Sequence, residues 1–178
     1  MNEEKTLREY GLDLLNPYIE KINHKDTKSF ITEALSYVPE RFFYIPASSS
    51  GKYHPSYALG TGGLIRHTAA ALYFAECLFP IFHFTSRQKD YIRAALILHD
   101  TQKPSKTHPL EVKFNLEPLR DKYPTIFEEV IPIVECHMGE WNYFGKFPTP
   151  QSSTEKFAHL CDYLASRKEV SVDLFSRD

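Results

Sequence analysis

The sequence has few cysteines, and their spacing matches no cross-linked or thiolate-ligated class of protein. Cys77, Cys136 and Cys161 are far apart and form no C-x-x-C pair. An odd number of cysteines at such spacing disfavours both a disulfide framework and a thiolate zinc site. We therefore expect each cysteine to occupy core space as a reduced thiol.

Long apolar runs and a strong net charge are also missing. No stretch approaches the roughly 18 uninterrupted apolar residues of a membrane span, and the start, MNEEKTLREYG, is acidic where a signal peptide would be basic and then apolar. The net charge of −2 gives no overall attraction to nucleic acid or an anionic membrane. We expect a soluble cytoplasmic protein with no membrane partner.

Phosphate-binding loops and nucleophile motifs are absent as well. GTGGLIRH, residues 60–67, has glycines before a helical pattern but lacks the Lys-Ser/Thr ending and the preceding strand of a phosphate loop. There is no G-x-S-x-G motif, and the serines of PASSSGK have no strand context. These absences disfavour a nucleotide-binding α/β fold and a serine hydrolase.

Apolar residues at helical spacing, in contrast, recur along the chain. The segments with this spacing are 7–15, 30–35, 64–79, 88–100, 125–138 and 154–168. Alternating strands with two-residue Gly turns do not occur, so we predict an all-α, single-domain bundle over 1–178, with an N-terminal helical part at 1–45 and a core at 46–168. Pro132 lies inside one pattern and predicts a kink or a late helix start.

Histidines are concentrated at the loops and ends of these predicted helices. Six of the eight are of this kind: His54, His67, His99, His108, His137 and His159. Asp100 follows His99 directly, and Asp162 lies three residues after His159, on the same helix face. Polar groups that converge from facing helices are how bundles build metal sites. Imidazoles and carboxylates without thiolates suit Mn, Fe, Ni, Co, Zn or Mg.

The order His67, His99-Asp100, Asp162 resembles the HD-domain superfamily of metal-dependent phosphohydrolases, whose members are α-helical. GGLIRHT, LHDTQK and HMGEW look most similar to the branch that includes HD domains of certain 3′→5′ exoribonucleases and small bacterial or phage HD proteins. The resemblance covers about residues 46–168. It implies an HD-type helical bundle and one or two divalent metal ions as cofactor.

The resemblance also implies roles for individual residues. One metal ion would be bound by His67, His99, Asp100 and Asp162, and in members with two metals His108 and His137 would join Asp100 around the second. Lys103 matches the family's lysine three residues after the aspartate. Two positions depart from the pattern: Gln102 replaces the usual small residue, and Cys136-His137-Met138 stands where some relatives have paired histidines.

Such a site needs no side-chain nucleophile. A divalent ion on imidazoles and a carboxylate lowers the pKa of bound water from 15.7 to about 7. Asp100 and Lys103 are then the expected catalytic residues, with Asp100 bridging the ions and Lys103 stabilising charge on a nonbridging phosphate oxygen.

Substrate contacts are expected from His54, Lys52, Arg66, Trp141 and His159. His54 donates a proton to the leaving oxygen or shapes a turn, and Lys52 lies in the same loop. Arg66 faces phosphate or is an exposed arginine at a helix start. Trp141, with Tyr143 and Phe144, stacks a base or packs its loop on the core. His159 is an outer ligand or a partner of Asp162.

We therefore expect a phosphohydrolase acting on a phosphomonoester or phosphodiester in a nucleotide or short single-stranded oligonucleotide, because near-neutral charge disfavours long duplexes. The alternatives are a non-catalytic, metal-dependent nucleotide-binding or regulatory protein, a di-iron oxygenase, and a purely structural helical protein.

Overall fold

The computed structural model describes residues 6–48, 50–141 and 147–170, and over these ranges the chain is helical with no strand. The α-helices are α1 (Leu7–Glu20), α2 (Lys25–Ala34), α3 (Gly63–Leu78), α4 (Ser86–Leu98), α5 (His108–Leu116), α6 (Pro124–Glu135) and α7 (Ser153–Ala165). Short 3-10 turns are η1 (Leu35–Tyr37), η2 (Glu40–Phe43), η3 (Ser56–Ala58), η4 (Glu117–Leu119) and η5 (Gly139–Trp141). The all-α prediction is confirmed.

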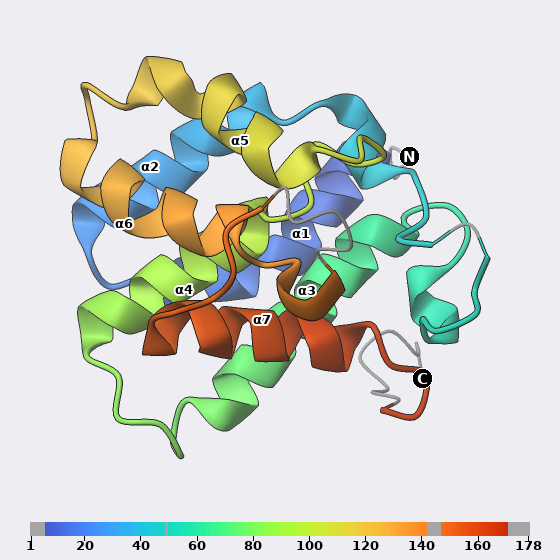
Figure 1. The fold of residues 1–178 in the computed structure, drawn as a ribbon. Helices are drawn as coiled ribbons and strands as arrows, with labels where there is room; N and C mark the ends of the chain where they lie inside the picture. The colour runs from blue at the N-terminus through green and yellow to red at the C-terminus, as the bar shows by residue number, and fades with distance from the viewer. Residues whose placement is uncertain (1–5, 49, 142–146, 171–178) are drawn as a thin grey trace.

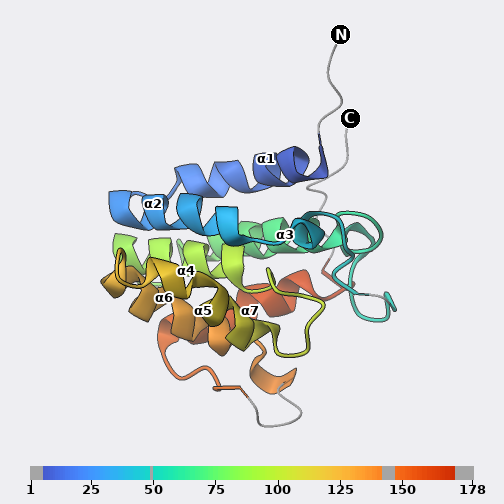
Figure 2. The same ribbon diagram turned by 90° about the horizontal axis from the view of Figure 1, so that it is seen from above.

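Helices α3 and α4 form the centre of the bundle. Figure 2 shows α1 and α2 on one side of them and α5, α6 and α7 on the other. Every residue of α4 from Asp90 to Leu98 is buried, as expected for a helix that is covered on all sides. The last turn of α4 therefore delivers the residues that follow it into the interior (Figure 1).

Local sequence signals fix several helix starts. A capping box, in which a hydroxyl side chain and a Glu or Gln three residues later satisfy each other's backbone N–H groups, opens α1, α4 and α7 at Thr6, Thr85 and Ser152. Helix α6 starts at Pro124, where proline's missing N–H costs nothing, and continues through Pro132. The late start that Pro132 offered as one alternative is therefore wrong.

Two further sequence expectations need correction. Helix α5 is not among the predicted segments, because its nine residues carry no well-defined apolar stripe. Cys77 is exposed rather than buried, because it lies on the outer face of α3, whereas Cys136 and Cys161 are buried as expected. No α-helix among the described residues is long and apolar enough to cross a membrane.

The polar segment before α3 is tied to that helix by backbone and arginine hydrogen bonds. Gly62 adopts a left-handed conformation (φ 71°) that favours glycine, and a Cβ on Gly63 would collide with the backbone of Ala58. The Arg66 guanidinium donates to the carbonyls of Tyr57 (2.6 Å) and Leu59 (2.9 Å). Arg66 therefore braces this loop from α3, instead of being the free, exposed arginine that the sequence favoured.

Candidate metal centre

Six buried side chains from separate elements meet on one side of α4. They are His67 in α3, His99 and Asp100 at the end of α4, His108 at the start of α5, His137 after α6 and Asp162 in α7, and no side chain among them is more than 9% exposed. The structure thus brings together all six residues that the sequence suggested as metal ligands. Charged and imidazole groups this deeply buried need partners to compensate for lost hydration.

Two imidazoles and two carboxylates form the first group. Nε2 of His67 lies 2.9 Å from Oδ1 of Asp162 and 3.7 Å from Oδ2 of Asp100. Nε2 of His99 lies 3.5 Å from the same Asp162 oxygen and 3.4 Å from the same Asp100 oxygen. These four donor atoms therefore surround one small volume.

The second group uses the other oxygen of Asp100. Oδ1 of Asp100 lies 3.1 Å from Nε2 of His108 and 3.5 Å from Nε2 of His137, and the two Nε2 atoms are 3.2 Å apart. Asp100 thus presents Oδ2 to one pair of histidines and Oδ1 to the other. Asp100 would therefore be able to contribute one oxygen to a cation on each side of it.

Backbone carbonyls set the orientation of three of the rings. In each case Nδ1 lies at hydrogen-bonding distance from the carbonyl three residues earlier: His99 with Leu96 (2.7 Å), His108 with Ser105 (2.8 Å) and His137 with Val134 (2.6 Å). A carbonyl only accepts, so Nδ1 carries the proton and the lone pair of each neutral ring is on Nε2. Fixing the ring from behind is typical of histidine metal ligands.

The donor set fits a divalent cation. The lone pairs of His108 and His137 face each other at 3.2 Å and repel unless a proton or a cation lies between them. Nε2 of His99 and Oδ1 of Asp100 are buried without a hydrogen bond, although polar groups in protein interiors are nearly always satisfied. Imidazole nitrogen and carboxylate oxygen are ligands for divalent first-row metals and zinc.

The charges of this cluster are strongly coupled. Burial raises the pKa of Asp100, but Lys103 and the neighbouring histidines outweigh burial and hold the pKa well below its usual range. Nζ of Lys103 lies 2.7 Å from Oδ2 of Asp100, so this lysine is not a solvated loop residue. For Asp162, burial raises the pKa, but the contacts with His67 and His99 outweigh burial and hold the pKa well below its usual range.

The pKa values of His99 and His137 are shifted in opposite directions. Burial lowers the pKa of His99, but Asp100, Asp162 and the Leu96 carbonyl have a larger, opposite effect. Together they raise the pKa of His99 to about 8. Burial dominates at His137 and lowers its pKa. His137 is therefore neutral at pH 7 and available to bind a cation, whereas His99 would have to lose a proton first.

A cavity of about 470 Å³ opens onto these residues. Its lining consists of Tyr53, His54, His67, Asp100, Lys103, His108, His137, Met138, Trp141, Asp162, Ser166 and Arg167. Of the residues expected to contact substrate, His54 and Trp141 line it, whereas Lys52, Arg66 and His159 do not. Tyr143 and Phe144 lie outside the described residues.

His54 and His159 have roles that the sequence described only in part. The His54 ring lies 5.5 Å from that of His67, and burial, with His67 and Lys103 nearby, lowers its pKa to about 4. A ring that is neutral at pH 7 is poorly suited to protonate a leaving oxygen as an imidazolium. Nδ1 of His159 donates to the carbonyl of His137 (2.7 Å). His159 therefore supports the backbone at His137, whereas the sequence offered it as an outer ligand or a partner of Asp162.

Sequence reasoning did not single out Met138, Ser166 or Arg167, and it named Tyr53 only as part of the loop with Lys52 and His54 that could close over a substrate. All four residues line the cavity. Tyr53 adjoins His54, and that adjacency was the one available signal. Arg167 and Ser166 follow α7 directly, and no local pattern distinguishes them from an ordinary helix end.

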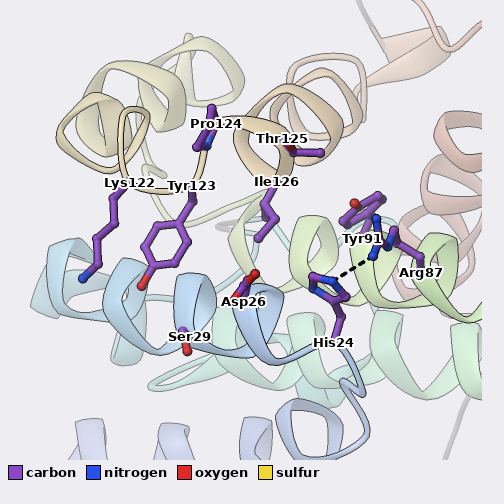
Figure 3. Close-up of a pocket in the computed structure, with 10 residues that line it drawn as sticks. All are labelled: His24, Asp26, Ser29, Arg87, Tyr91, Lys122, Tyr123, Pro124, Thr125 and Ile126. Carbon is purple, nitrogen blue, oxygen red and sulfur yellow. Dashed lines mark hydrogen bonds between the residues drawn. The ribbon is translucent and has the colours of Figure 1, made fainter.

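A second cavity, of about 600 Å³, lies where α2, α4 and α6 begin, away from the cluster (Figure 3). Three of its polar side chains have partners: His24 and Arg87 are 2.9 Å apart, and Lys122 pairs with Glu33 at 2.6 Å. Lys122 is largely exposed, so the cavity has no convergent set of buried donors. Buried histidines and aspartates line the cavity of about 470 Å³, which is therefore the candidate site.

A scan against protein-family models matches residues 64–167 to the HD domain. The comparisons with curated proteins and with solved structures gave no match. The matched region includes all six clustered histidines and aspartates and spans more than half of the 178 residues. The chain therefore belongs to the HD-domain family, within a superfamily of metal-dependent phosphohydrolases.

Proposed function

We propose that the protein hydrolyses a phosphomonoester or phosphodiester in a nucleotide or short single-stranded oligonucleotide. The observation that carries the proposal is Asp100, whose two buried oxygens each face a separate pair of histidines at the floor of a cavity. This geometry supports a site for two divalent cations. When bound, such cations lower the pKa of a bound water and stabilise negative charge on phosphoryl oxygens.

The chain's own residues would orient the substrate above that floor. Lys103 lines the cavity, and its ammonium lies beside Asp100. A phosphate oxygen of a substrate that binds next to Asp100 would therefore be close to this ammonium. A substrate phosphate placed there receives a charge-assisted hydrogen bond, which strengthens as negative charge develops on the phosphoryl group. Neutral His54, on the loop above, is a hydrogen-bonding partner for the substrate.

The test combines metal analysis with a substrate screen on the full chain. Wild type is assayed with Mn²⁺, Mg²⁺, Fe²⁺, Co²⁺, Ni²⁺ and Zn²⁺ against nucleoside monophosphates, cyclic nucleotides and short RNA and DNA, with Asp100→Ala as control. We expect turnover that a chelator abolishes and that the variant lacks. Equal turnover by both proteins would rule out the proposed mechanism, and bound metal without turnover would favour the regulatory alternative.

A further inference from the structure

The cavity has two chemically different walls. Its floor consists of the imidazoles, carboxylates and Lys103, whereas its outer wall includes Tyr53, Met138 and Trp141. A site that only binds cations and a phosphate group has no need for an aromatic wall, since phosphate recognition uses charge and hydrogen-bond donors. The wall therefore points to a second, planar part of the ligand.

Trp141 is held in place from behind. Its ring stacks on Tyr163 of α7 with the planes 7° apart and the centroids 5.3 Å apart, and the ring of His159 meets it edge-on at 5.5 Å. Figure 1 shows η5, which carries Trp141, next to α7. His159 also bonds the carbonyl of His137, so the tryptophan is mechanically linked to a residue of the metal centre.

Arg167 connects the aromatic residues to one another. Its guanidinium carbon lies 4.0 Å from the ring centroid of Tyr163, 5.2 Å from that of Trp141 and 6.0 Å from that of Tyr53. A planar guanidinium over an aromatic face is a favourable cation–π arrangement. Arg167 thus joins the Tyr53 loop to the η5 turn.

The residues on either side of Arg167 connect Tyr53 to Asp162. The N–H of Lys168 donates to the carbonyl of Tyr53 (2.8 Å), and the N–H of Ser166 donates to the carbonyl of Asp162 (3.0 Å). The aromatic wall therefore keeps a fixed position relative to the carboxylate that faces His67. A ligand that bridges wall and floor finds both parts already in place, which reduces the ordering cost of binding.

We propose that Tyr53 and Trp141 form a nucleobase subsite that takes one unstacked base, so that the substrate is a nucleoside monophosphate or the terminal nucleotide of a single strand. This inference rests on the proposed function and narrows its substrate class. A cavity of about 470 Å³ lies in the range that encloses one compact organic ligand. Bases inside a duplex have both faces covered, so only an unstacked base can lie on the ring.

The chain offers a direct optical readout, because Trp141 is its single tryptophan. Full-length protein with Mg²⁺ is titrated with a nucleoside 5′-monophosphate and, as matched ligand, with ribose 5-phosphate, which lacks only the base. N-acetyltryptophanamide corrects for absorption by the nucleotide. We expect saturable quenching of tryptophan fluorescence by the nucleotide and none by ribose 5-phosphate, and identical responses to the two ligands would overturn the subsite.

Kinetics provide a second, independent readout. We compare kcat/KM for the same two compounds in wild type, Trp141→Ala and Trp141→Phe, after circular dichroism has shown that the variants fold. Loss of a stacked ring is expected to reduce the nucleotide's advantage over ribose 5-phosphate by about 5-fold or more, with a smaller reduction for phenylalanine. An equal fall for both substrates in Trp141→Ala would mean that Trp141 is only structural and would contradict the inference.

The failure of this inference and the failure of the proposed function are distinguishable. Quenching by the nucleotide without turnover of either compound would keep the base subsite and remove the hydrolase function. Turnover of both compounds at equal kcat/KM without quenching would keep the hydrolase function and remove the base subsite.

Discussion

Asp100 is the residue on which both halves of the metal centre depend, because each of its oxygens faces a different pair of imidazoles. Asp100→Asn keeps the shape of the side chain but removes its charge. We expect it to lose metal from both halves, whereas His137→Ala should empty only the half that contains His108. Metal per chain, measured by plasma mass spectrometry after desalting, checks this, and full metal content in Asp100→Asn would contradict it.

Metal binding should also depend on pH through His99. Its pKa is raised to about 8 in the folded chain, above the ordinary value of about 6.5. The bound proton therefore stabilises the metal-free fold fully below about pH 6.5, and this contribution disappears as the pH rises through about 8. A cation has to displace that proton, so metal affinity should increase with pH up to about 8.

Isothermal titration with Mn²⁺ between about pH 6 and about pH 9 measures this dependence. Repeating it in buffers of different ionisation enthalpy counts the protons released on binding. An affinity that stays constant across this range, with no proton release, would show that His99 does not exchange a proton for the cation.

At the scale of elements, the start of α3 positions His67. Gly63→Ala would push a methyl group into the backbone of Ala58, while Gly60→Ala meets no atom and only strains a positive φ of 65°. We expect Gly60→Ala to lower the free energy of unfolding by about 1–2 kcal/mol and Gly63→Ala to lower it by more, by roughly 2–3 kcal/mol. Urea denaturation of both variants compares them, and equal losses would show that the contact with Ala58 is relieved by a small shift.

The sequence was informative where function places polar residues at the ends of buried helices. His99 and Asp100 stand out because they follow a run of apolar residues, whereas the choice of the six clustered residues came from the resemblance to HD domains. Helix α5 was missed although His108 was identified, because its nine residues have no well-defined apolar stripe and begin with His108-Pro109, which is also typical of a loop. Tertiary packing supplies most of the stability of such a short helix, and the spacing of apolar residues in a single sequence does not reveal that packing.

For the molecule as a whole, bound metal should stabilise the fold. The donors come from α3, α4, α5, α7 and the turn after α6, so a cation that binds only the assembled site shifts the unfolding equilibrium of the whole bundle. At a free concentration about 100 times the dissociation constant the gain is about 2.7 kcal/mol. Thermal melts with Mn²⁺ and with a chelator should differ for wild type and coincide for Asp100→Asn.

The cavity beside the candidate metal centre was less predictable than the six clustered residues. Tyr53 and Arg167 are more than a hundred positions apart in the chain, and their contact depends on how the loop before α3 meets the end of α7. Likewise, the sequence contains no sign that Arg66 braces that loop. Neither the branch of the superfamily nor the division into parts 1–45 and 46–168 is tested by the structure, and both stay predictions.

The bonds that hold three of the imidazoles from behind bear on how a cation leaves. His99, His108 and His137 each bond a carbonyl within their own turn, so no ring can swing away without breaking a local bond. Rotation of any of these three rings therefore costs a local hydrogen bond, so we expect a bound cation to leave on the side of the cluster that faces the cavity, which Lys103 also lines. Because the proposed substrate would occupy the same cavity, we expect bound substrate to slow the release of metal as well.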